Sequence, residues 1–77
     1  MRTLKDFQDD PAFWEYLDNL ESRLVACGID KDDLPGMTGF RLRTVWGTLT
    51  GSLHYFSPMC LRSIENVIRH AEEALNS

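Results

Sequence analysis

The chain has 77 residues, of which 43% are hydrophobic and 26% are charged, as in one small globular domain. It has no run of about 18 apolar residues and no apolar stretch at its start, so the sequence predicts neither a membrane span nor a secretory signal. Two cysteines are too few for a disulfide-rich secreted scaffold, which favours a reducing, cytoplasmic location. We therefore expect one domain over residues 1–77.

The chain is acidic, with twelve acidic and eight basic residues and a net charge of −4. This negative charge repels a phosphate backbone, so nucleic acid is not the partner that the composition favours. The close basic pair of Arg41 and Arg43 is the main local exception. Most of the acidic residues lie in the first half of the chain: Asp6, Asp9, Asp10, Glu15, Asp18, Glu21, Asp30, Asp32 and Asp33.

The first long helix is predicted over residues 11–27. Asp10 and Pro11 are typical of a helix start, because aspartate caps the first amides and proline suits the first helical position. Apolar residues then recur at alternating steps of four and three, which places them on one face. Gly28 follows where a helix commonly ends in a left-handed residue.

A second long helix is predicted over residues 58–75. Ser57 and Pro58 repeat the same start signal, and the apolar residues from Leu61 to Leu75 again step by three and four.

The middle segment, residues 40–56, has two interpretations. Its apolar residues also fit one helical face, but its threonines, Val45 and two glycines suit a helix poorly. The alternative is a β-hairpin with strands at 40–46 and 52–56. The helix is favoured because flanking helices offer it an apolar face, whereas a lone hairpin is marginal. The residues expected to face inward are Leu42, Trp46, Leu49, Leu53 and Phe56.

These elements predict an all-α fold, a compact three-helix bundle with a short helical turn at residues 3–8. The alternative is a helix–β-hairpin–helix arrangement. Between the first two helices, residues 28–39 are expected to form one long connection, with a single turn at 30–33 and a chain reversal at Pro35 and Gly36.

The sequence offers little catalytic or metal chemistry. Cys27, His54, Cys60 and His70 could form a zinc site in principle, but they lack the close spacing of zinc ligands. A calcium loop counted from Asp30 has no glycine at its sixth position. No nucleophile motif or phosphate-binding loop is present. We expect no enzymatic activity, no metal and no cofactor.

The outer face of the predicted 40–56 helix is the first candidate for a binding surface. Gly47 and Gly51 would form a flat groove there with Tyr55, open to close approach by another backbone. Two exposed glycines within a helix cost about 1–2 kcal/mol together, and a partner would compensate for that cost. The alternative is that the glycines mark a kink or a hairpin and contact no partner.

Two further pairs of residues are also either partner contacts or structural residues. Trp14 and Tyr16 flank the apolar face of the 11–27 helix, where they are either interface anchors or a cover for the core. Arg41 and Arg43 either pair with the aspartates at 30–33 or bind an acidic partner.

The function that these features favour is a small acidic regulator that occupies the surface of another protein, as an inhibitor, adaptor or anti-activator. A homodimer through the 40–56 helix is one version of it. The alternatives are a helix-turn-helix-like nucleic-acid binder that reads with the 58–75 helix, and an acidic mimic of nucleic acid. The predicted partner contacts are Trp14, Tyr16, Arg41, Arg43, Gly47, Gly51 and Tyr55.

Overall fold

The computed structural model describes residues 9–76, which form four α-helices and one 3-10 turn and contain no β-strand. The all-α prediction is confirmed, and the hairpin over 40–56 is excluded because that segment has no strand. The predicted turn at 3–8 lies outside the described residues. The elements are α2 (Pro11–Ala26), η1 (Lys31–Asp33), α3 (Leu34–Thr38), α4 (Leu42–Thr50) and α5 (Pro58–Leu75).

Helix α2 begins and ends at the predicted signals. The Asp10 carboxylate accepts a hydrogen bond from the Ala12 amide at 3.0 Å, which satisfies one of the unpaired donors of the first turn. At the other end Gly28 is left-handed, with φ of 73°. The amide of Ile29 reaches back to the carbonyl of Leu24 at 3.0 Å, so the chain leaves the helix through a closed turn.

Helix α5 also matches its prediction. The Ser57 hydroxyl accepts from the Cys60 amide at 3.2 Å, and Pro58 occupies the first helical position. The residues that α5 buries are Cys60, Ile64 and Ile68, spaced four apart along one face.

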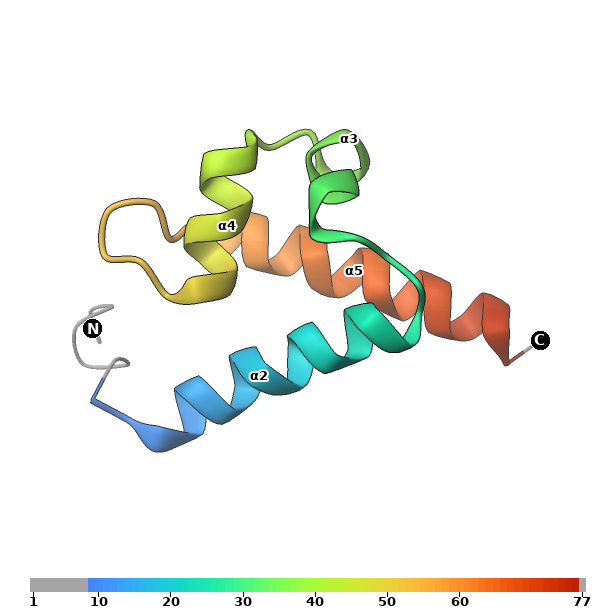
Figure 1. The fold of residues 1–77 in the computed structure, drawn as a ribbon, viewed down its shortest axis with the longest axis horizontal. Helices are drawn as coiled ribbons and strands as arrows, with labels where there is room; N and C mark the ends of the chain where they lie inside the picture. The colour runs from blue at the N-terminus through green and yellow to red at the C-terminus, as the bar shows by residue number, and fades with distance from the viewer. Residues whose placement is uncertain (1–8, 77) are drawn as a thin grey trace.

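Helices α2 and α5 run in the same direction along the long dimension of the molecule (Figure 1). Tyr16 donates a hydrogen bond to Glu65, and Arg23 donates through Nε to Glu72 at 3.0 Å. Both pairs join residues 49 apart, which is the constant offset of two parallel helices. Residues 28–57 therefore have to lead the chain from the end of α2 back to the level where α2 begins, and this return contains η1, α3 and α4.

The Arg23–Glu72 pair gives the stability of the fold an acid dependence. Hydrogen bonding to Arg23 lowers the pKa of the Glu72 carboxyl below its ordinary value. A carboxyl with a lowered folded-state pKa stabilises above its unfolded value and loses that contribution as the pH falls through the folded value. The native chain should lose unfolding free energy as the pH falls from about 6 to about 3, and Glu72→Gln should make that loss smaller. Urea denaturation at each pH measures the difference. The same change at exposed Glu15 on α2 is the control, and an equal reduction there would contradict the prediction.

The connection between α2 and α4 is more ordered than predicted. Asp30 caps η1 by accepting from the Asp32 amide at 3.0 Å, which matches the expected turn at 30–33. The segment expected to reverse direction is instead the five-residue helix α3. Pro35 fits there because the first turn of a helix needs no amide donor at that position. Fully buried Leu34 holds this short helix against the core.

Helix α4 is shorter than predicted. It has nine residues and ends at Gly51, which is left-handed with φ of 71°. The amide of Ser52 donates to the carbonyl of Gly47 at 2.8 Å and closes the last turn. Leu53 and Phe56 therefore belong to the following loop, residues 51–57, and not to the helix.

The structure also corrects which side of α4 faces the core. Leu42 and Trp46 were predicted to be inside, but their exposed fractions are 47% and 46%. Val45, Thr48 and Leu49 are buried instead. The predicted face depended on two apolar residues beyond the end of the helix. Without Leu53 and Phe56, the helix instead buries Val45 and Leu49, which are four residues apart and therefore lie on one face, packed in the core with α5.

Gly47 and Gly51 were likewise predicted to face outward but are buried, and so is Thr48 between them. Thr48 is fully enclosed, and its hydroxyl accepts a hydrogen bond from the Ser57 amide at 3.1 Å. Its polar group is thereby satisfied, and α4 is tied to the start of α5.

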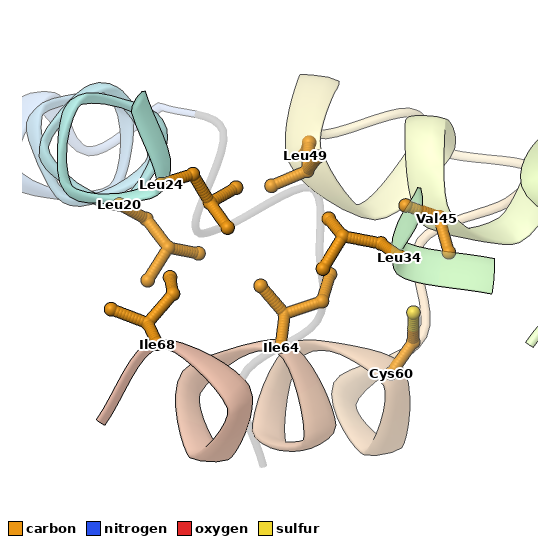
Figure 2. Packing of buried hydrophobic residues seen from close by; sticks show 8 residues of the cluster. All are labelled: Leu20, Leu24, Leu34, Val45, Leu49, Cys60, Ile64 and Ile68. Carbon is orange, nitrogen blue, oxygen red and sulfur yellow. The ribbon is translucent and has the colours of Figure 1, made fainter. Parts of the chain in front are cut away.

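All four helices contribute to one apolar core. Figure 2 shows the side chains from α2, α3 and α4 pointing toward the face of α5, with Ile64 near the centre. The buried cluster consists of Leu20, Leu24, Leu34, Val45, Leu49, Cys60, Ile64 and Ile68. This core fixes α4 against α5 and leaves the opposite side of α4 exposed.

Candidate functional site

An open groove lies between the exposed face of α4 and the 51–57 loop, which Figure 1 shows in yellow and orange beside α4. We call it the α4 groove. Its volume is about 630 Å³, within the usual range for ligand and peptide sites. The lining residues are Leu42, Arg43, Trp46, Gly47, Thr50, Ser52 and Tyr55.

One wall of the groove is a regular helical face. Leu42, Trp46 and Thr50 follow one another at four-residue steps, so they stand in a row along α4. Tyr55 from the loop forms the facing wall and is 44% exposed. A single exposed apolar side chain is ordinary on a protein surface, but three large ones around one hollow form a patch of the kind that binds partners.

Gly47 allows the two walls to approach each other. A Cβ added at Gly47 would lie 3.0 Å from the carbonyl carbon of Tyr55 and closer still to its Cβ. The loop can therefore lie directly on the helix only because residue 47 has no side chain. The predicted close approach of another backbone at Gly47 does occur, but the backbone is the chain's own loop.

Cations border the aromatic rings of the groove. The guanidinium carbon of Arg43 lies 5.4 Å from the centre of the Tyr55 ring, and Lys31 Nζ lies 5.5 Å from that of Trp46. Both distances are within the range of cation–π attraction, which is worth about 0.5–1 kcal/mol at exposed sites. Lys31 also pairs with Glu21 at 2.6 Å. The groove thus has apolar walls and a basic edge on a chain whose net charge is negative.

Of the two interpretations of Arg41 and Arg43, the structure contradicts the pairing with the aspartates at 30–33. Within residues 9–76 no ion pair of 4.0 Å or less joins Arg41 or Arg43 to those carboxylates. Asp30 is occupied in capping η1, and Arg43 turns toward the Tyr55 ring. Arg41 directly precedes α4 and is exposed.

The predicted contact residues fall into two groups. Arg43, Gly47 and Tyr55 meet in the α4 groove, with Arg41 next to it in sequence. Trp14 lies away from this set. A Cβ added at Gly51 would be 2.9 Å from Cζ3 of the Trp14 ring, so that ring packs on the end of α4.

Trp14 is also part of an aromatic cluster. Its ring is 5.2 Å from that of Phe13, which in turn is 5.8 Å from Phe56 of the loop. Trp14 nevertheless remains 40% exposed. The ring therefore covers one end of the core, as one of the two interpretations expected, while its outer side stays exposed to solvent.

Tyr16 connects two helices. Its hydroxyl donates to Glu65, and partial burial together with that bond raises the pKa of the hydroxyl above its ordinary range. Tyr16 is 37% exposed at the side of α2, and it is not among the residues that line the α4 groove. This assigns Tyr16 a structural contact that the sequence did not predict.

Leu42 and Trp46 are the large apolar groove residues that sequence reasoning missed, because both were assigned to the core. The signal that could have found them is Gly51. A glycine that ends the helix at residue 50 removes the two downstream members of the predicted apolar face, and the remaining nine residues then favour the Val45 side.

Other chemistry is sparse in the described part of the chain. Residues 9–76 contain no group of three or more histidine, cysteine or acidic side chains placed to hold a metal ion. Cys27 and Cys60 are free thiols, and burial raises the pKa of the Cys60 thiol despite a hydrogen bond with Thr48. Within the same range, no helix has the length and apolar character needed to cross a bilayer.

The link between α4 and α5 bears on the helix-turn-helix alternative. It contains seven residues, 51–57, whereas the DNA-binding motif uses a turn of three or four. At the start of α5, Met59 and Arg62 are exposed but Cys60 is buried in the core. The expected recognition helix therefore offers one basic side chain in its first turns.

Together the acidic composition, the all-α fold of residues 9–76 and the α4 groove describe a small helical protein with an exposed apolar groove that cations border. No protein-family model, curated protein or solved structure matches the chain. The α4 groove is therefore the feature of this chain that bears on its function.

Proposed function

We propose that the protein is a regulator that binds another protein through the α4 groove and acts by occupying that protein's surface, as an inhibitor, adaptor or anti-activator. The observation that carries the proposal is the exposure of Leu42, Trp46 and Tyr55 around one hollow. Aromatic residues in such positions supply much of the binding energy in protein interfaces. Lys31 and Arg43 lie within cation–π range of the Trp46 and Tyr55 rings, so each anchor ring has a basic side chain beside it.

The test compares capture of partners by the native chain and by the double variant Trp46→Ala, Tyr55→Ala. Both side chains are about half exposed, so we expect the variant to stay folded by circular dichroism. A protein retained from a lysate of the source cells by the native chain should bind the variant at least about tenfold more weakly, as expected for loss of interface anchors.

A matched control removes exposed apolar side chains elsewhere. Val25 on α2 and Met59 on α5 are 73% and 74% exposed and lie outside the groove. Val25→Ala, Met59→Ala should retain the partner fully. Equal capture by the groove variant and the native chain would remove the proposal, whereas loss in both variants would show that the effect is not specific to the groove.

Self-association through the groove is the less favoured version of this function. In a two-fold dimer each groove faces its own copy, so Arg43 and Lys31 of both chains would meet across one interface. Like charges brought together in this way oppose association. We expect light scattering after size exclusion to give the mass of a monomer, and a dimer that Trp46→Ala dissociates would contradict this expectation.

A further inference from the structure

We infer that the α4 groove takes an acidic protein segment, in which one or two large apolar side chains are flanked by carboxylates. This inference rests on the proposed function and specifies the chemistry of the partner. Three features of the groove carry it: what its walls are made of, which charges remain unpaired at its edge, and how long it is.

The walls select an apolar anchor. Leu42, Trp46 and Tyr55 present hydrocarbon and ring surface, and the backbone of Gly47 forms the floor between them. A polar side chain that entered this hollow would give up water for few hydrogen-bond partners. A leucine, phenylalanine or methionine would instead cover the rings and be covered by them.

The edge selects negative charge. Arg43 has no ion pair with any residue from 9 to 76, and its guanidinium carbon lies 5.4 Å from the centre of the Tyr55 ring. Arg41, next to the groove, is likewise exposed and without an ion pair in that range. None of the lining residues is acidic. A carboxylate beside the anchor could form a two-point hydrogen bond with Arg43 while the ring contact is kept.

The length of the groove limits the segment. The nine residues of α4 extend about 13 Å at 1.5 Å per residue, which matches about two turns of a partner helix. That length accommodates two anchors at positions i and i+4, or one anchor with an acidic residue on each side.

Aromatic rings beside cations can also stack the bases of single-stranded nucleic acid. One observation favours the acidic segment here. The walls contain Leu42 as well as rings, and an aliphatic side chain gives a base no ring to stack on. Nucleic acid is therefore kept as an outcome of the test.

The experiment titrates the ¹⁵N-labelled chain with three synthetic 12-residue peptides that share the same leucine and phenylalanine at i and i+4. Their flanking positions are all glutamate, all glutamine or all lysine. The signal followed is the indole N–H of Trp46, assigned by its disappearance in Trp46→Phe. We expect the glutamate peptide to shift this signal and to bind about tenfold more tightly than the glutamine peptide. The lysine peptide should bind most weakly.

Two charge variants locate the effect. Arg43→Gln should remove most of the preference for glutamate over glutamine, while Arg62→Gln on α5 removes the same charge outside the groove and should leave the preference intact. Raising the salt concentration from about 50 to 500 mM should weaken the glutamate peptide more than the glutamine peptide.

The failures of the two proposals are distinguishable. Equal binding of the glutamate and glutamine peptides would overturn the charge inference, and so would no shift of Trp46 with any peptide. The proposed function would still stand if Trp46→Ala, Tyr55→Ala lost its captured partner. A single-stranded oligothymidine that shifted Trp46 at lower concentration than the glutamate peptide would also overturn the inference, in favour of nucleic acid.

Discussion

Ile64→Ala should lower the free energy of unfolding by about 2–5 kcal/mol, the usual cost of removing a large aliphatic side chain from a packed core. Ile64 is fully buried in the middle of α5, and Figure 2 places it among side chains from three other helices. A domain of 77 residues has a total stability of about 4–12 kcal/mol. The substitution therefore removes a large part of what holds the fold together, and urea denaturation followed by circular dichroism measures it.

The matched control for this prediction is Met59→Ala, in the first turn of the same helix. Met59 is 74% exposed, so its truncation should change the unfolding free energy by less than about 0.5 kcal/mol. If Ile64→Ala cost no more than Met59→Ala, the arrangement of α5 against the other helices would be wrong.

The two long helices were predictable because their boundaries are local. Asp10 and Ser57 cap the first turns through their own side chains, and Gly28 ends α2 through its backbone freedom. The apolar spacing between these signals then selects one buried face. Nothing distant in the sequence is needed for these assignments, and the structure confirms them.

The middle of the chain was not predictable to the same degree, because its helices are short. In α3 the proline and glycine suggested a turn, whereas the segment is a short helix whose first residue, Leu34, is buried in the core that α5 shares. In α4 nine residues offer two alternative apolar faces. The choice between Leu42 with Trp46 and Val45 with Leu49 is decided by packing on α5, which residue spacing alone does not reveal.

The candidate site shows the same division. Arg43, Gly47 and Tyr55 were predicted from the sequence, and all three line the groove. They could be predicted because a charge, a missing side chain and an aromatic ring can be recognised without knowing the fold. Sequence reasoning missed Leu42 and Trp46, because an apolar residue in a helix is assigned to the core unless it is known which face of that helix packs inward. The groove therefore became visible only when the direction of α4 was fixed by its neighbours.

Gly47→Ala should destabilise the chain by about 1–3 kcal/mol, as overpacking does in well-packed sites. The new Cβ would meet the backbone carbon and Cβ of Tyr55, and neither can move unless the 51–57 loop moves. The helical preference of alanine over glycine offsets up to about 1 kcal/mol of this cost. Because Tyr55 forms one wall of the α4 groove, the same substitution should weaken groove binding as well, measured with the glutamate peptide alongside urea denaturation.

Gly36→Ala in α3 is the matched control. A Cβ added there meets nothing within 4 Å, and Gly36 does not have a positive φ. That variant should be neutral or more stable by up to about 1 kcal/mol, because alanine loses less backbone entropy on folding. If both alanine variants were equally stable, the loop would not lie directly on α4. The α4 groove, which depends on that contact, would then have a different shape, and Tyr55 would not form its wall.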